Sequence, residues 1–183
     1  MKEIVFLGRG GQGGKTASLI LAESLINIGL NVQAFSEYGP ERSGAPVKSY
    51  IRFSKDIILT NSQIEEPDYL IVLDEGLLNT KDIVEFLSRK LVIIINSNKD
   101  PQSLNVKFNF LKHYKYFVID CDKIAQSIYK KPIVNICILG PLVNILEIKN
   151  LTSNVSASIT NKFHDKLNVK AYEQGLKKES IIP

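Results

Sequence analysis

The chain has 183 residues, of which 44% are hydrophobic and 23% charged, and its formal net charge is +4 at pH 7. This length and composition fit one globular domain, residues 1–183. The lysines are scattered and form no basic stripe with interleaved aromatic residues, which argues against a nucleic-acid binder. No apolar run approaches the roughly 20 residues that cross a bilayer, and the N-terminus lacks the pattern of a signal peptide. We therefore expect a cytoplasmic protein with neither nucleic acid nor membrane among its partners.

Short apolar runs alternate with helical stretches, which predicts α/β layers around a mostly parallel sheet. The pattern predicts strands at residues 3–7, 31–35, 47–53, 57–59, 69–73, 91–95 and 116–119. The short turn at 54–56 predicts a hairpin between the strands on either side of it. We expect a three-layer Rossmann-like α/β fold with a mostly parallel sheet, one β-hairpin and a helical C-terminal part.

Helices are predicted from apolar spacing and from capping residues. Residues 15–28 carry apolar side chains on one face, and Gly29 supplies the stop. Thr80 is placed to cap a helix that runs to Leu87. Residues 121–180 are expected to be largely helical, with Gly140-Pro141 ending or kinking one helix.

A glycine-rich segment, residues 8–16 (the glycine turn), follows the first strand and opens the first helix. Gly8, Gly10 and Gly13 fit G-x-G-x-x-G, in which backbone N–H groups bind an anion at a helix N-terminus. In a dinucleotide site, an acid about 20 positions further on holds the ribose, and Glu37 is roughly so placed. The alternative is a tight turn that packs closely or contacts a partner chain, and the turn alone leaves both interpretations open.

Gly14-Lys15-Thr16 also imitates the end of a nucleoside triphosphate-binding loop. The pattern G-x-x-x-x-G-K-[ST] requires glycine at position 9, where this chain has Arg9. The anion-binding geometry of that loop is therefore not expected to form. Asp74-Glu75 follows a buried strand, where α/β sheets gather their sites, but adjacent residues point in different directions and form no obvious acid–base pair, and a helix cap or a turn is the favoured interpretation.

Cysteine and histidine are too few for a metal centre in this chain. The sequence has only Cys121 and Cys137, and only His113 and His164. Without a Cys-x-x-Cys pair we expect no iron–sulfur cluster or zinc site, and we interpret both cysteines as buried, unreactive thiols. The histidines have no partners spaced for catalysis and are expected at the surface. No catalytic residue is predicted.

Residues 37–47 (the second motif) contain two acids, one arginine, two prolines and two glycines. Such a stiff, polar segment cannot be a core element. A desolvated arginine contributes most at an interface, and Arg42 is also suited to bind a phosphate or carboxylate. We interpret the second motif as a binding or interface loop.

Together the two motifs resemble the gamma subunits of the 2-oxoacid:ferredoxin oxidoreductases. The residues that carry the resemblance are Gly10-Gly11-Gln12-Gly13, Gln33-Ala34-Phe35, Glu37-Tyr38-Gly39-Pro40-Glu41-Arg42 and Gly44-Ala45-Pro46-Val47. The Gly-Ala-Pro stretch is similar to the pyruvate/2-oxoisovalerate branch. Ser43 stands where many relatives have a second arginine, and Pro141 replaces the usual alanine of a Leu-Gly-Ala-Leu-Val segment. Weaker matches continue to Gly175.

The resemblance implies a subunit of an enzyme that oxidatively decarboxylates a 2-oxoacid, here pyruvate, to its acyl-coenzyme A, with ferredoxin as electron acceptor. It implies that alpha, beta and delta subunits, or fused equivalents, hold thiamine diphosphate and the iron–sulfur clusters, and that coenzyme A is a co-substrate. This chain alone is expected to bind no cofactor. The alternatives are an independent dinucleotide-binding protein and a 2-oxoglutarate-specific gamma subunit.

The resemblance also implies two groups of site residues that face the partner subunits near the entrance to their active site. The first, a candidate contact with an anion, coenzyme A or a partner, is Gly10, Gly11, Gln12 and Gly13. The second is an interface loop consisting of Tyr38, Gly39, Glu41, Arg42 and Gly44. A pure scaffold without ligand contact remains open as a further possibility.

Overall fold

The computed structural model describes residues 1–38, 44–88, 90–177 and 180–182. The strands of this described part are β1 (Lys2–Arg9), β2 (Asn31–Tyr38), β3 (Pro46–Ser54), β4 (Tyr69–Val72), β5 (Val92–Asn96), β6 (Lys115–Ile119) and β7 (Ser180–Ile182). The helices are α1 (Gly14–Asn27), α2 (Lys81–Val84), α3 (Pro101–Lys107), α4 (Cys121–Tyr129), α5 (Leu139–Leu146), α6 (Leu151–Phe163) and α7 (Lys166–Lys177). Two short 3₁₀ helices are η1 (Glu75–Asn79) and η2 (Asn109–His113).

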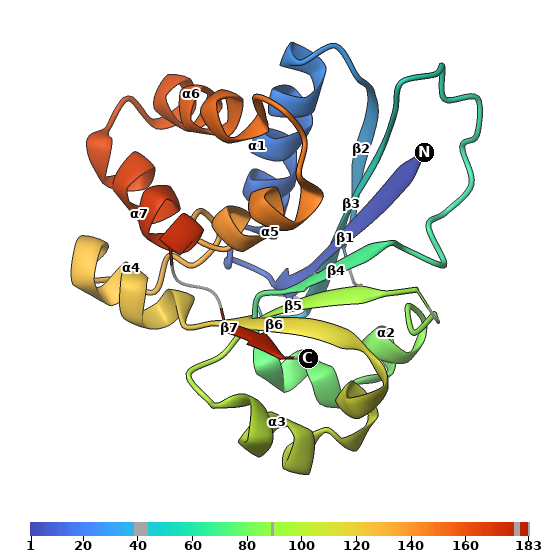
Figure 1. Ribbon diagram of the computed structural model, residues 1–183, viewed down its shortest axis with the longest axis vertical. Coiled ribbons are helices and arrows are strands. Elements are labelled where there is room, and N and C mark those ends of the chain that lie inside the picture. Colours follow the sequence, from blue (N-terminus) through green and yellow to red (C-terminus); the bar gives the residue numbers. More distant parts are fainter. Residues whose placement is uncertain (39–43, 89, 178–179, 183) are drawn as a thin grey trace.

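The strands form one sheet in the order β2-β3-β1-β4-β5-β6-β7 (Figure 1). Its centre is parallel, because β1, β4, β5 and β6 run in the same direction. The edges are antiparallel: β3 runs against both β1 and β2, and β7 runs against β6. The predicted α/β class with a parallel core is confirmed.

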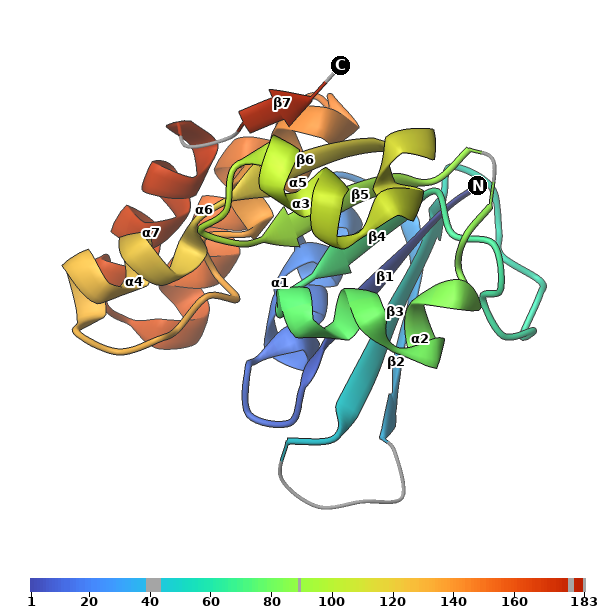
Figure 2. The same cartoon turned by 90° about the horizontal axis from the view of Figure 1, so that it is seen from below.

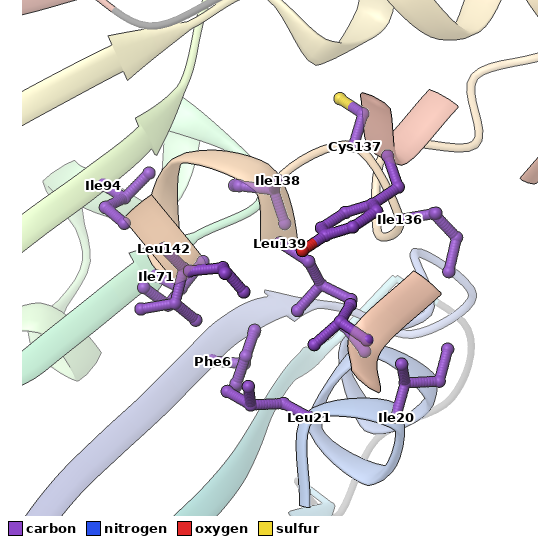
Figure 3. Packing of buried hydrophobic residues seen from close by; sticks show 14 of the residues in the cluster. Phe6, Ile20, Leu21, Ile71, Ile94, Ile136, Cys137, Ile138, Leu139 and Leu142 are labelled. Carbon is purple, nitrogen blue, oxygen red and sulfur yellow. The ribbon is translucent and has the colours of Figure 1, made fainter. Parts of the chain in front are cut away.

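Helices cover both faces of the sheet, as a three-layer fold requires (Figures 1 and 2). Successive residues of a strand point to opposite faces. Phe6 of β1 therefore joins one core with α1, α5, α6 and α7, while Leu7 joins the other with η1, α2 and α3. Figure 3 shows Phe6 close to Leu21 of α1, and Ile71 of β4 close to Leu142 of α5. Both cores are continuous and apolar, which fixes the positions of the strand ends.

The first helix forms as its apolar spacing predicts. Ala17, Leu21 and Leu25 are fully buried on one face of α1. Gly29 follows the C-cap residue in the left-handed region, at φ +87°, where an L-residue with a Cβ is strained. The predicted stop is therefore confirmed.

The predicted hairpin is misplaced. The antiparallel pairs join β2 to β3, from Asn31 opposite Ser54 to Tyr38 opposite Val47, and residues 57–59 form no strand. The physical reason is that β3 already lies between β2 and β1, so both of its edges are hydrogen-bonded. Ile57 and Leu59 are instead strongly exposed.

Two helix predictions also need correction. Pro141 lies in the first turn of α5, where a missing N–H leaves no helical hydrogen bond unmade, so Gly140-Pro141 begins a helix and does not end or kink one. Thr80 occupies the N-cap position of α2, but its hydroxyl donates backward to the Leu77 carbonyl (2.7 Å), and α2 has only four residues. The helical character of 121–180 is otherwise confirmed; the sequence did not predict β7, α3 or the two 3₁₀ helices.

Cysteine and histidine lie where the sequence predicts. Cys121 and Cys137 are fully buried and unbridged, and burial, with Cys137 beside it, raises the pKa of the Cys121 thiol. His113 and His164 are exposed. Across the described residues, no helix is both long enough and apolar enough to span a membrane.

Close packing of α5 on α7 generates a stability prediction. A Cβ on Gly175 would collide with the Cys137 carbonyl, and a Cβ on Gly140 would collide with the backbone at Gly175. Gly175→Ala should therefore lower the free energy of unfolding by about 1–3 kcal/mol, the usual cost of overpacking. Urea denaturation measures it, with Lys170→Ala on the exposed face of α7 as control. Equal stability of the two variants would contradict the packing argument.

Candidate functional site

The carboxyl ends of the parallel strands meet at one edge of the sheet, where the chain forms an open crevice of about 940 Å³. After β1 the chain enters α1 on one face, whereas after the neighbouring β4 it enters η1 on the other. Diverging connections of this kind open a crevice in α/β sheets. Its walls are the glycine turn (Gly10–Gln12), the residues that follow β4 and β5, and the first turn of α4. A second cavity of about 600 Å³ adjoins it beside β6. There the chain leaves β5 toward α3 on one face of the sheet and leaves β6 toward α4 on the other.

Different physical constraints favour glycine at the different positions of the glycine turn. A Cβ on Gly8 would press on Leu73, and one on Gly13 would collide with Asn135, whose Nδ2 donates to the Gly13 carbonyl (3.2 Å). Gly11, at φ +93°, has open space around its Cα and lines the crevice. Close packing therefore explains Gly8 and Gly13, while Gly10 and Gly11 form the crevice surface.

The two motifs of the sequence meet at Arg9 and at Gly10, of which Gly10 lines the crevice. The Gly10 N–H donates to the Ala45 carbonyl (2.9 Å), and Nη1 of Arg9 donates to the Gly44 carbonyl (3.3 Å). Gly44 needs its left-handed backbone, at φ +96°, to deliver the chain into β3. Backbone and side-chain hydrogen bonds thus join the glycine turn to the second motif.

Arg9 and Gln12 are organised around Asp74, the residue before η1. Nε of Arg9 donates to Oδ2 of Asp74 (2.7 Å), and Nε2 of Gln12 reaches the same oxygen (3.4 Å). Oε1 of Gln12 accepts from the Arg9 backbone N–H (2.7 Å), while Oδ1 of Asp74 accepts from the Gly76 N–H (2.8 Å). Asp74 therefore caps η1, as the capping interpretation predicts. The sequence did not single out Arg9 as a site residue, although its charge inside the glycine turn was a signal.

Glu75 is held as a carboxylate on the crevice wall. It pairs with Lys99 and Ser97, and Lys107 lies 3.2 Å from Oε1. Burial raises the pKa of Glu75, but the hydrogen bonds from Lys99, Ser97 and Lys107 outweigh it and lower the pKa to about 2. An acid so stabilised in its ionised form is a poor proton acceptor, so Asp74-Glu75 does not form an acid–base pair.

Buried Asn96 forms part of the crevice wall at the end of β5, and the sequence gave no sign of its role. Its Nδ2 donates to the Leu73 carbonyl (3.0 Å) and to Asp122 (2.8 Å), while its Oδ1 accepts from the Cys121 N–H (2.9 Å). One amide therefore joins the ends of β4 and β5 to the start of α4. It gives the crevice a fixed wall.

Glu37 does not lie at the glycine turn. Its carboxylate accepts from the Tyr50 hydroxyl (2.8 Å) and from Gln63 (3.3 Å), and burial together with this bond raises the pKa of Tyr50. Because β3 separates β2 from β1, Glu37 stands two strands away from the turn. The acid expected to hold a ribose is therefore missing from the crevice, which removes the main support for a dinucleotide site.

The predicted interface loop is described only in part. Gly39, Glu41, Arg42 and the side chain of Tyr38 lie outside the described residues. Gly44 is described and contacts Arg9. Among the described residues, no cluster of three or more His, Cys, Asp or Glu side chains is arranged to hold a metal ion.

Fold and crevice define an α/β protein of the class that carries a ligand or partner site at the carboxyl ends of its strands. Residues 3–178 match the pyruvate ferredoxin/flavodoxin oxidoreductase family, and the chain belongs to that family. It is 38% identical over 185 residues to the pyruvate synthase subunit PorC of Methanocaldococcus jannaschii, covering 97% of this chain and 99% of that protein. It is 35% identical to the pyruvate/ketoisovalerate oxidoreductases common subunit gamma of Pyrococcus abyssi, covering 100% and 99%.

A solved structure supports the fold over the whole chain. The crystal structure of the pyruvate oxidoreductase subunit PORC of Thermotoga maritima matches with a TM-score of 0.84 at 32% identity. The match covers 100% of this chain and 98% of that one. The resemblance drawn from the two motifs is thereby confirmed at the level of the family.

The ion pairs of Glu75 predict a pH dependence of stability. Because the pKa of Glu75 is lower in the folded chain than in the unfolded one, the ionised side chain stabilises the fold. This contribution to the free energy of unfolding is fully present above about pH 4.5 and is lost as the pH falls toward 2. Glu75→Gln should lower the unfolding free energy by about 1 kcal/mol near pH 7, after allowance for solvent screening. Urea titrations from pH 7 to pH 2.5 measure the difference, which should shrink with the pH. Glu173→Gln on the exposed face of α7 is the control, and a difference from wild type that does not vary with pH would contradict the assignment.

Proposed function

We propose that this chain, with residues 1–183 as one domain, is the gamma subunit of a thiamine-dependent pyruvate:ferredoxin oxidoreductase. The complex decarboxylates pyruvate oxidatively to acetyl-coenzyme A and passes the electrons to ferredoxin. Its alpha, beta and delta subunits, or fused equivalents, hold thiamine diphosphate and the iron–sulfur clusters. The chain works in the cytoplasm, contributes no catalytic residue, and assists assembly and the positioning of coenzyme A.

One observation carries the proposal beyond family membership. The two segments that resemble the gamma subunits lie apart in the sequence, yet Gly10 and Arg9 donate hydrogen bonds to the carbonyls of Ala45 and Gly44 beside the crevice wall that Gly10 forms. A surface built from both motifs is what a partner subunit or a shared substrate would contact. The relatives' names, which describe subunits of pyruvate oxidoreductases, agree with this role.

The crevice has the size and chemistry for part of coenzyme A. Its volume of about 940 Å³ is at the upper end of ordinary ligand pockets. Gly10 and Gly11 let a phosphate approach the backbone, and Lys123 lines the same crevice. Two of the carboxylates that line it are paired with cations, since Asp74 binds Arg9 and Glu75 binds Lys99 and Lys107. The repulsion of a phosphate by these two carboxylates is thereby reduced.

Affinity purification tests the subunit role. The tagged chain, purified from its native host without oxygen, should bring down larger chains and coenzyme A-dependent dye reduction with pyruvate. Parallel assays with 2-oxoisovalerate and 2-oxoglutarate define the substrate. Recovery of the chain alone, from a lysate that contains the thiamine and cluster proteins, would contradict the proposal and favour an independent ligand-binding protein.

A matched pair of glycine variants tests the crevice. Gly11 and Gly29 both have a left-handed backbone and open space around the Cα. Gly11 lines the crevice before the N-terminus of α1, whereas Gly29 follows the C-terminus of α1. Gly11→Ala and Gly29→Ala should each cost about 1 kcal/mol of stability. In the reconstituted complex only Gly11→Ala should raise the KM for coenzyme A, by about tenfold for each 1.4 kcal/mol of lost binding. Equal KM values would contradict a role of the glycine turn in positioning coenzyme A.

A further inference from the structure

We propose that Arg9 is a positioning residue: its side chain joins Asp74, its counter-ion, to the Gly44 carbonyl and so holds in place the part of the crevice wall that Gly10–Gln12 and Asp74 form. This inference rests on the proposed function, because it concerns the same crevice.

The geometry of the Arg9 guanidinium supports a bridging role. Nε donates to Asp74 after β4 (2.7 Å), while Nη1 donates to the Gly44 carbonyl before β3 (3.3 Å). Arginine presents several donors in a rigid planar fork, so one side chain joins two segments in a fixed relation. The Arg9 backbone adds a third connection, because its N–H donates to Oε1 of Gln12 within the glycine turn.

Stability alone gives little reason for this arrangement. The side chains of Arg9 and Asp74 are 39% and 26% exposed, and an ion pair so open to water contributes little to folding. Yet Asp74 lines the crevice, and the Arg9 side chain donates to the same Asp74 oxygen that Gln12, a second lining residue, also reaches. A pair of small energetic value at the wall of a candidate site is better explained by the position it imposes.

The chain provides its own control at the other end of the same two strands. Lys2 begins β1 and binds Asp68, the residue before β4, also at 2.7 Å, with side chains 51% and 30% exposed. The Lys2–Asp68 pair therefore links the same strands as Arg9–Asp74, with the same distance and similar exposure. It lies at the amino edge of the strands, away from the crevice. If the Arg9–Asp74 pair had only a structural role, breaking it should change the KM for coenzyme A no more than breaking the Lys2–Asp68 pair.

The test compares Arg9→Met, Arg9→Lys and Asp74→Asn with Lys2→Met in the complex reconstituted from all its subunits without oxygen. Both Arg9 variants should raise the KM for coenzyme A, by about 3- to 30-fold, the usual range for a coupling residue. Arg9→Lys keeps the charge beside Asp74, but one ammonium cannot also reproduce the fork to Gly44. We therefore expect no rescue by lysine. Asp74→Asn should raise the KM in the same direction, and kcat should change less than the KM in every variant.

Each other outcome overturns the inference. A KM for Arg9→Lys equal to that of wild type would mean that charge suffices and that the bridge to Gly44 has no role. Equal behaviour of Arg9→Met and Lys2→Met would make Arg9–Asp74 an ordinary surface pair. If Arg9→Met fails to assemble, Asp74→Asn decides, and an unchanged KM in that variant rejects the role.

The glycine variants separate this inference from the proposed function. A raised KM in Gly11→Ala, together with unchanged KM values in the Arg9 and Asp74 variants, would leave the crevice assignment standing and reject the positioning role alone. Failure of the wild-type chain to join any active complex would reject the proposed function itself.

Discussion

The pairing of β3 with β1 is the constraint on which the candidate site depends. The two strands pair residue for residue, from Lys2 opposite Phe53 to Arg9 opposite Pro46. This register places the end of the second motif beside the start of the glycine turn. A shift of one residue would turn the alternating side chains of β3 to the wrong face of the sheet, so burial of both faces locks it. Two segments separated by the twenty residues 17–36 are thus brought together by the core.

Polar groups at the crevice are arranged so that each buried or half-buried charge has a partner. Arg9 forms an ion pair with Asp74, and Lys99 and Lys107 form ion pairs with Glu75. The Asn96 amide donates a hydrogen bond to Asp122. Such pairing allows several charges to gather at one sheet edge without a large desolvation penalty. Glu75, whose pKa the hydrogen bonds from its lysines and Ser97 lower to about 2 against the effect of burial, is ionised at neutral pH.

The sequence predicted those features that depend on local pattern. Ala17, Leu21 and Leu25 mark α1 by their spacing, and Gly29 ends it because the left-handed backbone favours glycine. The parallel strands were predicted because each contains a short, mainly apolar run that can be buried on both faces.

Features that depend on distant partners were missed or misplaced. Residues 57–59 are as apolar as a strand, but the edge of β3 that they would need is occupied by another strand. β7 was missed because its pairing with β6 joins segments more than sixty positions apart along the chain. Arg9 and Asn96 bind carbonyls and carboxylates that only folding brings near them. The local spacing of residues in the sequence does not predict such contacts.

Hydrogen exchange on the intact complex, with and without coenzyme A and in the absence of oxygen, tests the central claim most directly. We expect slower exchange on addition of coenzyme A in peptides that cover Gly10–Gln12 and residues 44–46, with no change around Gly29 at the far end of α1. Unchanged exchange at the glycine turn, in a complex that binds coenzyme A elsewhere, would contradict it.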